Sequence, residues 1–334
     1  PAATATPLRP PPPPPAGDPR RPPPAQRWVP VARPRTARPL DGPPAATEPE
    51  RPARDPAGPV RPGHEHETLP AVATLPADDG DFWELRVVPN KFPSFDGTEP
   101  LGPTPEERAA ASGSCEVVIF TPDHNRDLAD CSPHQATALL QVIAERCRAH
   151  AGLPAVAHTS IIVNRGRTSG ASLTHPHAQL LSTPFVPPTV QIELDGFTAE
   201  PQVLARTIDQ HPDGIVARRD HAVSVCPPWA GFPFETWIVP AAPTRSMTEA
   251  DADELADVGA LLVDLLGRLR RVLGDVDYNI TFRVPPPRAD GPFAWHLQVL
   301  PRHVPLAGFE LSAGVAVNAT PAEVAADRLR TVAS

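Results

Sequence analysis

The chain has few cysteines, no long apolar run and no excess of positive charge, and each shortage excludes a class of protein. Its four cysteines are widely spaced and never form a Cys-X-X-Cys pair, so neither a disulfide framework nor a cysteine-only zinc site is expected. No stretch of about 18 apolar residues and no segment resembling a signal peptide is present. The net charge of −9 argues against a general nucleic-acid binder, which needs clustered Lys and Arg. We expect a soluble, cytoplasmic protein with no membrane and no nucleic acid among its partners.

Proline is the residue in excess, with 50 in 334 positions. Many lie in the first seventy residues, where Pro10 to Pro15 is an unbroken run and no apolar periodicity appears. We predict that residues 1–25 form a disordered or polyproline-like tail. The chain as a whole is 40% hydrophobic, which suffices for a sizeable core in the remainder.

Three helices are predicted from their ends. The stretch from Ser132 to Gln135 reads Ser-Pro-His-Gln, which is a capping box with proline at the first helical position. A longer helix starts at Thr248 or a near neighbour and ends before Gly274. Thr320 is predicted to cap a short C-terminal helix. The apolar stripes of these helices are interpreted as core.

Eight strands are predicted from short apolar runs, and their order along the chain repeats. They cover residues 82–88, 115–120, 160–163, 177–181, 222–226, 235–239, 279–282 and 295–300. In each half of the chain, two strands precede a helix and two follow it. This pattern predicts an α+β protein made of a duplicated unit, with a mostly antiparallel sheet covered by helices. We expect the two halves to cover residues 26–190 and 191–334.

The run His-Pro-His-Ala-Gln at residues 175–179 is the most informative motif. If it is extended, His175, His177 and Gln179 share one face, because strand side chains alternate. A neutral imidazole can attack phosphorus or carbon, ligate a metal or shuttle a proton; the alternative is an ordinary pair of histidines on a strand. The repeat aligns this motif with His296-Leu-Gln298, which lacks the first histidine. We infer one chemically competent copy and one structural partner.

Further short motifs accompany this run in a fixed order. They are Arg27-Trp-Val-Pro-Val-Ala32, Arg35-Thr-Ala-Arg-Pro39, Val87-Val-Pro-Asn-Lys-Phe-Pro93, Phe120-Thr-Pro-Asp-His124, Asn164-Arg-Gly166, Gly170-Ala-Ser172, Pro233-Phe-Glu-Thr-Trp237 and Gly308-Phe-Glu310. On these motifs the chain resembles the galactose-1-phosphate uridylyltransferase family of the histidine-triad superfamily, including its ADP-glucose phosphorylase relatives. The resemblance runs from about residue 27 to about residue 330 and implies two histidine-triad-like halves.

The resemblance implies a ping-pong nucleotidyl transfer between a nucleoside-diphosphate sugar and a sugar 1-phosphate. His177 is the expected nucleophile, forming a covalent nucleotidyl-histidine, and Gln179 is expected to donate its amide to a phosphoryl oxygen. The leading hypothesis is an enzyme that moves a uridylyl group between UDP-glucose and a hexose 1-phosphate of the galactose 1-phosphate type. The alternatives are an ADP-sugar phosphorylase or hydrolase, and a non-catalytic nucleotide-sugar binding protein.

Substrate-binding residues are also implied by the resemblance. A glycine-rich loop is expected to let the backbone approach the phosphates, and other polar residues match positions that hold nucleotide, phosphate or sugar hydroxyls. The loop residues are Gly166, Gly170 and Ser172, and the others are Arg35, Arg38, Asn90, Asn164 and Glu310. Ordinary roles stay open, namely a solvated basic segment for the arginines and a turn for Asn90.

Many members of the family hold a structural zinc ion with a Cys-X-X-Cys pair and two histidines. The two histidines match His124 and His175, but Gly58 and Arg61 replace the cysteines, and neither can ligate zinc. We therefore predict a metal-free or metal-poor protein with an incomplete residual zinc site. Arg61 could instead occupy the vacated space.

The resemblance to the family also bears on two other possible metal positions. His64 and His66 lie a few residues beyond the missing cysteines and could substitute for them. A second metal site of some members has His-X-His where this chain has His296-Leu-Gln298, so that site is expected to be absent.

The resemblance also implies a homodimer.

Overall fold

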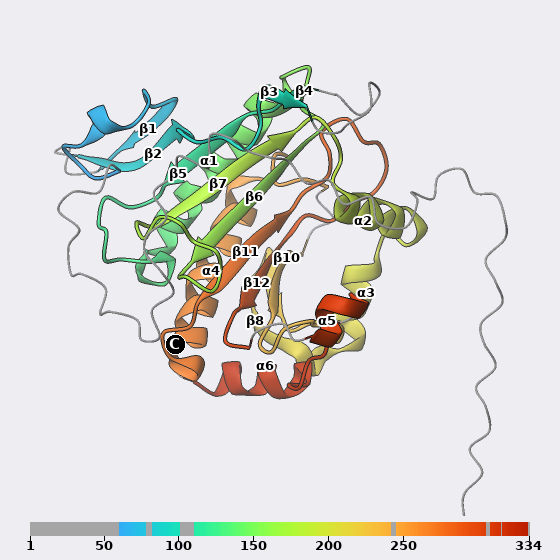
Figure 1. Ribbon diagram of the computed structural model, residues 1–334. Coiled ribbons are helices and arrows are strands. Elements are labelled where there is room, and N and C mark those ends of the chain that lie inside the picture. The colour runs from blue at the N-terminus through green and yellow to red at the C-terminus, as the bar shows by residue number, and fades with distance from the viewer. Residues whose placement is uncertain are drawn as a thin grey trace, which may run out of the picture.

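The computed structural model describes residues 60–77, 82–100, 110–241, 245–304, 308–314 and 316–332, and only the backbone at 96–100 and 110–112. The predicted tail, together with Arg35, Arg38 and Gly58, lies outside these residues. The dominant element is one ten-stranded antiparallel sheet (Figure 1) in the order β1-β2-β5-β7-β6-β11-β12-β10-β9-β8. The strands are β1 (Ala73–Pro76), β2 (Trp83–Pro89), β5 (Cys115–Ile119), β7 (His177–Thr183), β6 (His158–Arg165), β11 (Tyr278–Arg283), β12 (His296–Pro301), β10 (Thr236–Pro240), β9 (Ala222–Val225) and β8 (Ile215–Arg218). A separate pair joins β3 (Asp96–Pro100) to β4 (Ala110–Ser112). The predicted α+β class with a mostly antiparallel sheet is confirmed.

The sheet contains the same arrangement twice. Strands β2-β5-β7-β6 have the order that β9-β10-β12-β11 have in the second part of the chain. Helix α1 (Pro133–Ala151) connects β5 to β6, and helix α4 (Ala252–Leu273) connects β10 to β11. The two arrangements join through the antiparallel pairing of β6 with β11. The repeated element order predicted from the sequence is therefore visible in the topology, while the division at residue 190 stays a prediction.

Helices α1 and α4 form where the sequence supplies their ends. The Ser132 side chain accepts a hydrogen bond from the Gln135 backbone at 3.1 Å, and the Gln135 side chain accepts one from the Ser132 backbone at 2.9 Å. Helix α4 starts at Ala252, four residues after Thr248, because the Asp251 side chain caps the backbone N–H of Glu254 at 2.8 Å. It ends at Gly274, whose φ of 78° suits glycine.

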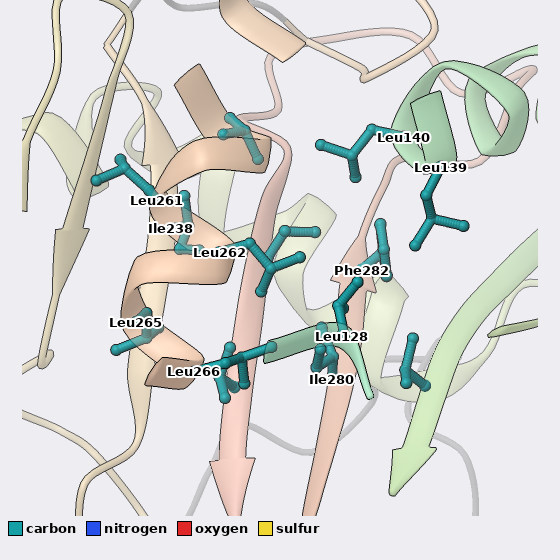
Figure 2. Packing of buried hydrophobic residues seen from close by; sticks show 14 of the residues in the cluster. Leu128, Leu139, Leu140, Ile238, Leu261, Leu262, Leu265, Leu266, Ile280 and Phe282 are labelled. Carbon is teal, nitrogen blue, oxygen red and sulfur yellow. The ribbon is translucent and has the colours of Figure 1, made fainter. Parts of the chain in front are cut away.

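The main core lies between these two helices and one face of the sheet. Figure 2 shows leucines of α4 and α1 packed against Ile280 and Phe282 of β11. Each fully buried side chain of this kind contributes about 1.5–3 kcal/mol relative to exposure. Ala178 and Leu180 of β7 belong to the same core. Because strand residues alternate, His177 and Gln179 face the other side of the sheet.

On that other side, the second repeat is covered by two helices that the sequence pattern did not indicate. They are α2 (Pro188–Ala199) and α3 (Val203–Gln210). Their Leu194, Phe197, Leu204 and Ile208 pack against Val223 and Val225 of β9. The remaining helical segments are α5 (Gly308–Ala313), α6 (Ala322–Thr331) and the short turns Glu65–Glu67, Leu128–Asp130 and Pro212–Gly214. None of the helices described here is long and apolar enough to cross a membrane.

The predicted cap of the C-terminal helix is wrong. Pro321 occupies the position before α6, and no side chain caps the helix there. The Thr320 backbone N–H instead donates to the Asn318 side chain at 2.9 Å. Thr320 therefore ends a turn and does not start the helix.

Candidate active site

A row of polar side chains crosses the middle of the sheet, on the face opposite α1 and α4. The register of β6 and β7 pairs Val163 with Ala178, and the next pair along it is Asn164 with His177. Asn164 in turn pairs with Asn279 of β11. Since neighbouring strands are about 4.8 Å apart, the backbone at Asn279 lies about 10 Å from that at His177.

The hydrogen bonds of His177 indicate which of its ring nitrogens carries the proton. Its Nδ1 lies 2.8 Å from the carbonyl oxygen of His175. A carbonyl only accepts hydrogen bonds, so Nδ1 carries the proton and Nε2 carries the lone pair. The Gln179 amide nitrogen lies 3.4 Å from this Nε2, on the acceptor side of the ring. Both side chains are buried, and they share one face as the alternation predicts.

The glycine-rich loop at residues 166–172 approaches this row from the end of β6. Gly166 and Gly170 both have a φ of 82°, a conformation that favours glycine. A Cβ atom at Gly166 would overlap the carboxylate of Asp277, whereas one at Gly170 would meet nothing within 4 Å. The same carboxylate accepts hydrogen bonds from the backbone and the hydroxyl of Thr168, both at 2.7 Å. Asp277 therefore holds the loop in shape, and Ser172 lies half-buried at its far end.

The other predicted binding residues lie in different places. The Asn164 Oδ1 accepts a hydrogen bond from the Asn279 amide at 2.7 Å, within the row. The Asn90 Oδ1 accepts one from the Phe92 backbone at 2.9 Å, which is the ordinary turn role. Glu310 is half-buried on α5, which comes later in the chain than the strands of the row. Arg35 and Arg38 lie outside the described residues.

The residual zinc positions come together, but they do not complete a site. The rings of His124 and His175 lie 5.4 Å apart between centroids. The His175 Nε2 lies 2.8 Å from the Thr121 carbonyl oxygen, while its Nδ1 is buried without a hydrogen-bond partner. Burial lowers the pKa of His175 to about 4, and the charge of Arg61 is among the smaller contributions in the same direction. Arg61 is therefore close enough to disfavour the charged form of His175, while its occupation of the vacated space stays a prediction.

Nothing else in the described part of the chain supplies the missing ligands. No group of three or more His, Cys, Asp or Glu side chains suited to a metal ion occurs among the described residues. His64 stacks on His66 at 6.1 Å and contacts Glu67 at 2.8 Å. Two imidazoles alone do not fit a closed tetrahedral zinc site, so no chemical step is assigned to a metal here.

The second repeat contains the same histidine-glutamine geometry, with an aromatic side chain stacked on the histidine ring. The His296 Nδ1 lies 2.9 Å from the Ala294 carbonyl, and the Gln298 amide nitrogen lies 3.2 Å from the His296 Nε2. However, the His296 ring stacks on the Trp237 indole at 4.7 Å and 23°. Burial also lowers the pKa of His296 to about 4. The indole therefore covers one face of the His296 ring. That only the first copy is chemically competent stays a prediction.

Asn279 and Arg302 belong to the row, although the sequence analysis did not identify them. The Asn279 amide donates to the Ser169 carbonyl at 2.9 Å, in addition to Asn164. Its Oδ1 accepts a hydrogen bond from the Arg302 Nε at 2.5 Å. The repeat places Asn279 on the strand equivalent to that of Asn164, and this equivalence was the only available signal.

The fold and this row define a class of protein, namely a duplicated α+β scaffold with a buried histidine–glutamine pair beside a glycine-rich loop. The family model described as "Galactose-1-phosphate uridyl transferase, N-terminal domain" matches residues 18–187. The chain belongs to the galactose-1-phosphate uridylyltransferase family. Members of this family are enzymes that act on sugar 1-phosphates.

Individual relatives differ in how much of the chain they match. ADP-glucose phosphorylase of Arabidopsis thaliana is 29% identical over 92% of this chain and 90% of its own length. Galactose-1-phosphate uridylyltransferase of Streptomyces lividans is 27% identical over 58% of this chain and 53% of its own length. The solved Arabidopsis ADP-glucose phosphorylase with bound ADP-glucose covers 86% of this chain at a TM-score of 0.75 and 27% identity. A solved uridylyltransferase covers 78% at a TM-score of 0.69 and 28% identity.

Proposed function

We propose that this chain transfers a nucleotidyl group from a nucleoside-diphosphate sugar to a phosphate acceptor through a covalent intermediate on His177. The observation that carries the proposal is the tautomer of His177. Its Nδ1 proton is held by the His175 carbonyl, so the Nε2 lone pair is available to attack phosphorus. The family membership supplies the substrate class.

The contacts around His177 support a two-step reaction. The Nε2 lone pair attacks the α-phosphorus, and the bond from that phosphorus to the bridging oxygen breaks, so sugar 1-phosphate leaves. The ring then carries a positive charge, which the His175 carbonyl stabilises by accepting the Nδ1 hydrogen bond. An acceptor phosphate attacks the same phosphorus and restores the neutral ring.

Gln179 has a different partner in each state of this cycle. At rest its amide faces the His177 Nε2 at 3.4 Å. Once Nε2 is bonded to phosphorus it has no lone pair to accept this hydrogen bond. The amide is then free to donate to a phosphoryl oxygen on the group just attached, where negative charge develops.

Sequence coverage favours ADP-glucose as donor and inorganic phosphate as acceptor. The Arabidopsis ADP-glucose phosphorylase matches nearly the whole chain, whereas the Streptomyces uridylyltransferase matches little more than half of it. Transfer of a uridylyl group between UDP-glucose and galactose 1-phosphate is the second candidate, and the matching family model favours it.

Covalent labelling tests the proposal. The purified chain is incubated with ADP-glucose or UDP-glucose labelled at the α-phosphorus, and the protein is then treated with acid and with base. We expect a base-stable, acid-labile label that is absent from H177N and retained by H296N, since Trp237 covers His296. Circular dichroism checks that both variants fold.

The label then identifies the acceptor. Release by inorganic phosphate supports the phosphorylase, release by galactose 1-phosphate supports the uridylyltransferase, and release by water alone supports a hydrolase. A wild-type chain that binds either nucleotide sugar but never becomes labelled would refute covalent transfer and leave a binding protein.

A further inference from the structure

Arg302 lies at the far end of the polar row from His177. It follows β12, and its backbone N–H donates to the Asp277 carbonyl at 2.7 Å. Its Nε donates to Asn279, whose amide contacts Asn164. Its guanidinium stacks over the Phe232 ring at 4.6 Å. These contacts hold the guanidinium through its Nε and its ring contact, and neither terminal nitrogen makes a hydrogen bond within the described part of the chain.

Arg302 has no carboxylate partner among the described residues. Arg86 and Arg245 also lack one there, but each donates a terminal N–H to a neutral oxygen, whereas the terminal N–H groups of Arg302 have no acceptor in the described part of the chain. Arg146 pairs with Glu116 at 2.7 Å, Arg165 with Asp127 at 3.0 Å, and Arg283 also with a glutamate. Burial alone lowers the pKa of Arg302, although the group stays charged. A partly desolvated guanidinium without a counter-ion is a receptor for an anion.

We propose that Arg302 binds the second phosphate of the nucleotide sugar, with Asn279 as the residue that positions it. This inference rests on the proposed function. His177 takes the first phosphorus, so the second phosphate must lie beyond it. Arg302 follows β12, the third strand from β7, and its side chain reaches back to Asn279, which lies about two strand spacings from His177. Its terminal N–H groups then donate to phosphate oxygens in the bidentate geometry that guanidinium groups prefer.

The same contact serves both half-reactions. The phosphate that leaves with the sugar and the phosphate that later attacks the nucleotidyl group occupy the same place, by microscopic reversibility. Arg302 therefore stabilises the leaving group in the first step and binds the acceptor in the second. Water, which carries no charge, gains nothing from Arg302.

Binding measurements in the unreactive H177N background isolate the second phosphate. Calorimetric titration compares ADP-glucose with AMP, and UDP-glucose with UMP, for H177N, H177N/R302Q and H177N/R328Q. We expect R302Q to weaken binding of the nucleotide sugar about 10- to 100-fold and binding of the nucleoside monophosphate less than about twofold. Arg328 is exposed on α6, so R328Q removes one charge and should change neither affinity. R302K should give an intermediate loss, because it keeps the charge without the planar fork.

Discharge of the labelled enzyme gives a second measurement. R302Q should slow discharge by subsaturating phosphate about 10- to 100-fold and leave discharge by water within about twofold. Equal losses for nucleotide sugar and monophosphate, or for phosphate and water, would overturn the assignment, as would no loss at all. A wild-type chain that binds ADP-glucose without becoming labelled refutes the covalent mechanism instead, and the calorimetric comparison still decides the role of Arg302.

Discussion

Replacement of Gly166 by alanine tests whether Asp277 shapes the glycine-rich loop, and Gly170 provides a matched control. Both glycines have a φ of 82°, so an alanine at either position costs about 1–2 kcal/mol for the left-handed conformation. Only at Gly166 would the added methyl group overlap the Asp277 carboxylate. The two variants therefore share the backbone penalty and differ in the overlap.

The size of that difference follows from the contacts that Asp277 makes. To clear the methyl group, the carboxylate must leave its two 2.7 Å hydrogen bonds to Thr168. Hydrogen bonds to charged groups contribute about 1.5–3 kcal/mol each, and partial exposure keeps the loss near the lower end. We expect G170A to lose about 1–2 kcal/mol of unfolding free energy and G166A to lose about 4–5 kcal/mol.

Urea unfolding of the two variants, followed by fluorescence and circular dichroism, measures the difference. Thermal unfolding should agree, at about 2 °C per kcal/mol for a chain of this size. In a D277A background the penalty of G166A should fall to that of G170A, because the obstructing carboxylate is gone. Equal penalties for G166A and G170A in the wild-type background would refute the placement of Asp277 over the loop.

Three further outcomes are expected. Burial lowers the pKa of His158 from 6.5 to about 4. As the pH falls, His158 therefore takes up its proton in the unfolded chain before it does so in the folded chain. The stability that this residue contributes is complete above pH 6.5 and is lost towards pH 4, at about 1.4 kcal/mol per pH unit. H158L should show a shallower loss between pH 6.5 and 4 in urea unfolding, and identical slopes would contradict this account. S132A should lose about 1 kcal/mol through its capping box, whereas T320A should lose almost nothing, and similar losses in thermal unfolding would disprove the assignment of caps. Metal analysis should find less than one zinc per chain, since His124 and His175 lack further ligands among the described residues; one tightly held zinc would show that residues outside that part complete the site.

The elements that the sequence predicted correctly are those with local signals. The capping box at Ser132 and the glycine at position 274 mark helix ends that the structure confirms within a residue or two. Helices α2 and α3 were missed because neither has a side-chain cap. Helix α2, for example, is held by burial of Leu194 and Phe197 against a strand that comes later in the chain, and such a contact has no local signature in the sequence.

The candidate site divides in the same way. His177 and Gln179 lie two residues apart on one strand, so alternation alone places them on one face. Arg302 and Asn279 enter the site only because β6 pairs with β11, a contact between strands more than a hundred residues apart in the chain. No property of Arg302 in the sequence distinguishes it from an exposed arginine. That it has no carboxylate partner within the described ranges becomes visible only once its surroundings are known.

The pairing of β6 with β11 also has a consequence for dynamics. The strands that carry His177, Asn164 and Asn279 lie at the centre of the ten-stranded sheet, with a hydrogen-bonded neighbour on both sides. Central strands open only with the global unfolding of a domain, whereas exposed loops open at little cost. The amide protons of β6, β7 and β11 should thus exchange with solvent most slowly, and those of residues 166–172 quickly. A substrate that binds here meets strands that are already in place, so little of the entropy lost on binding comes from ordering them.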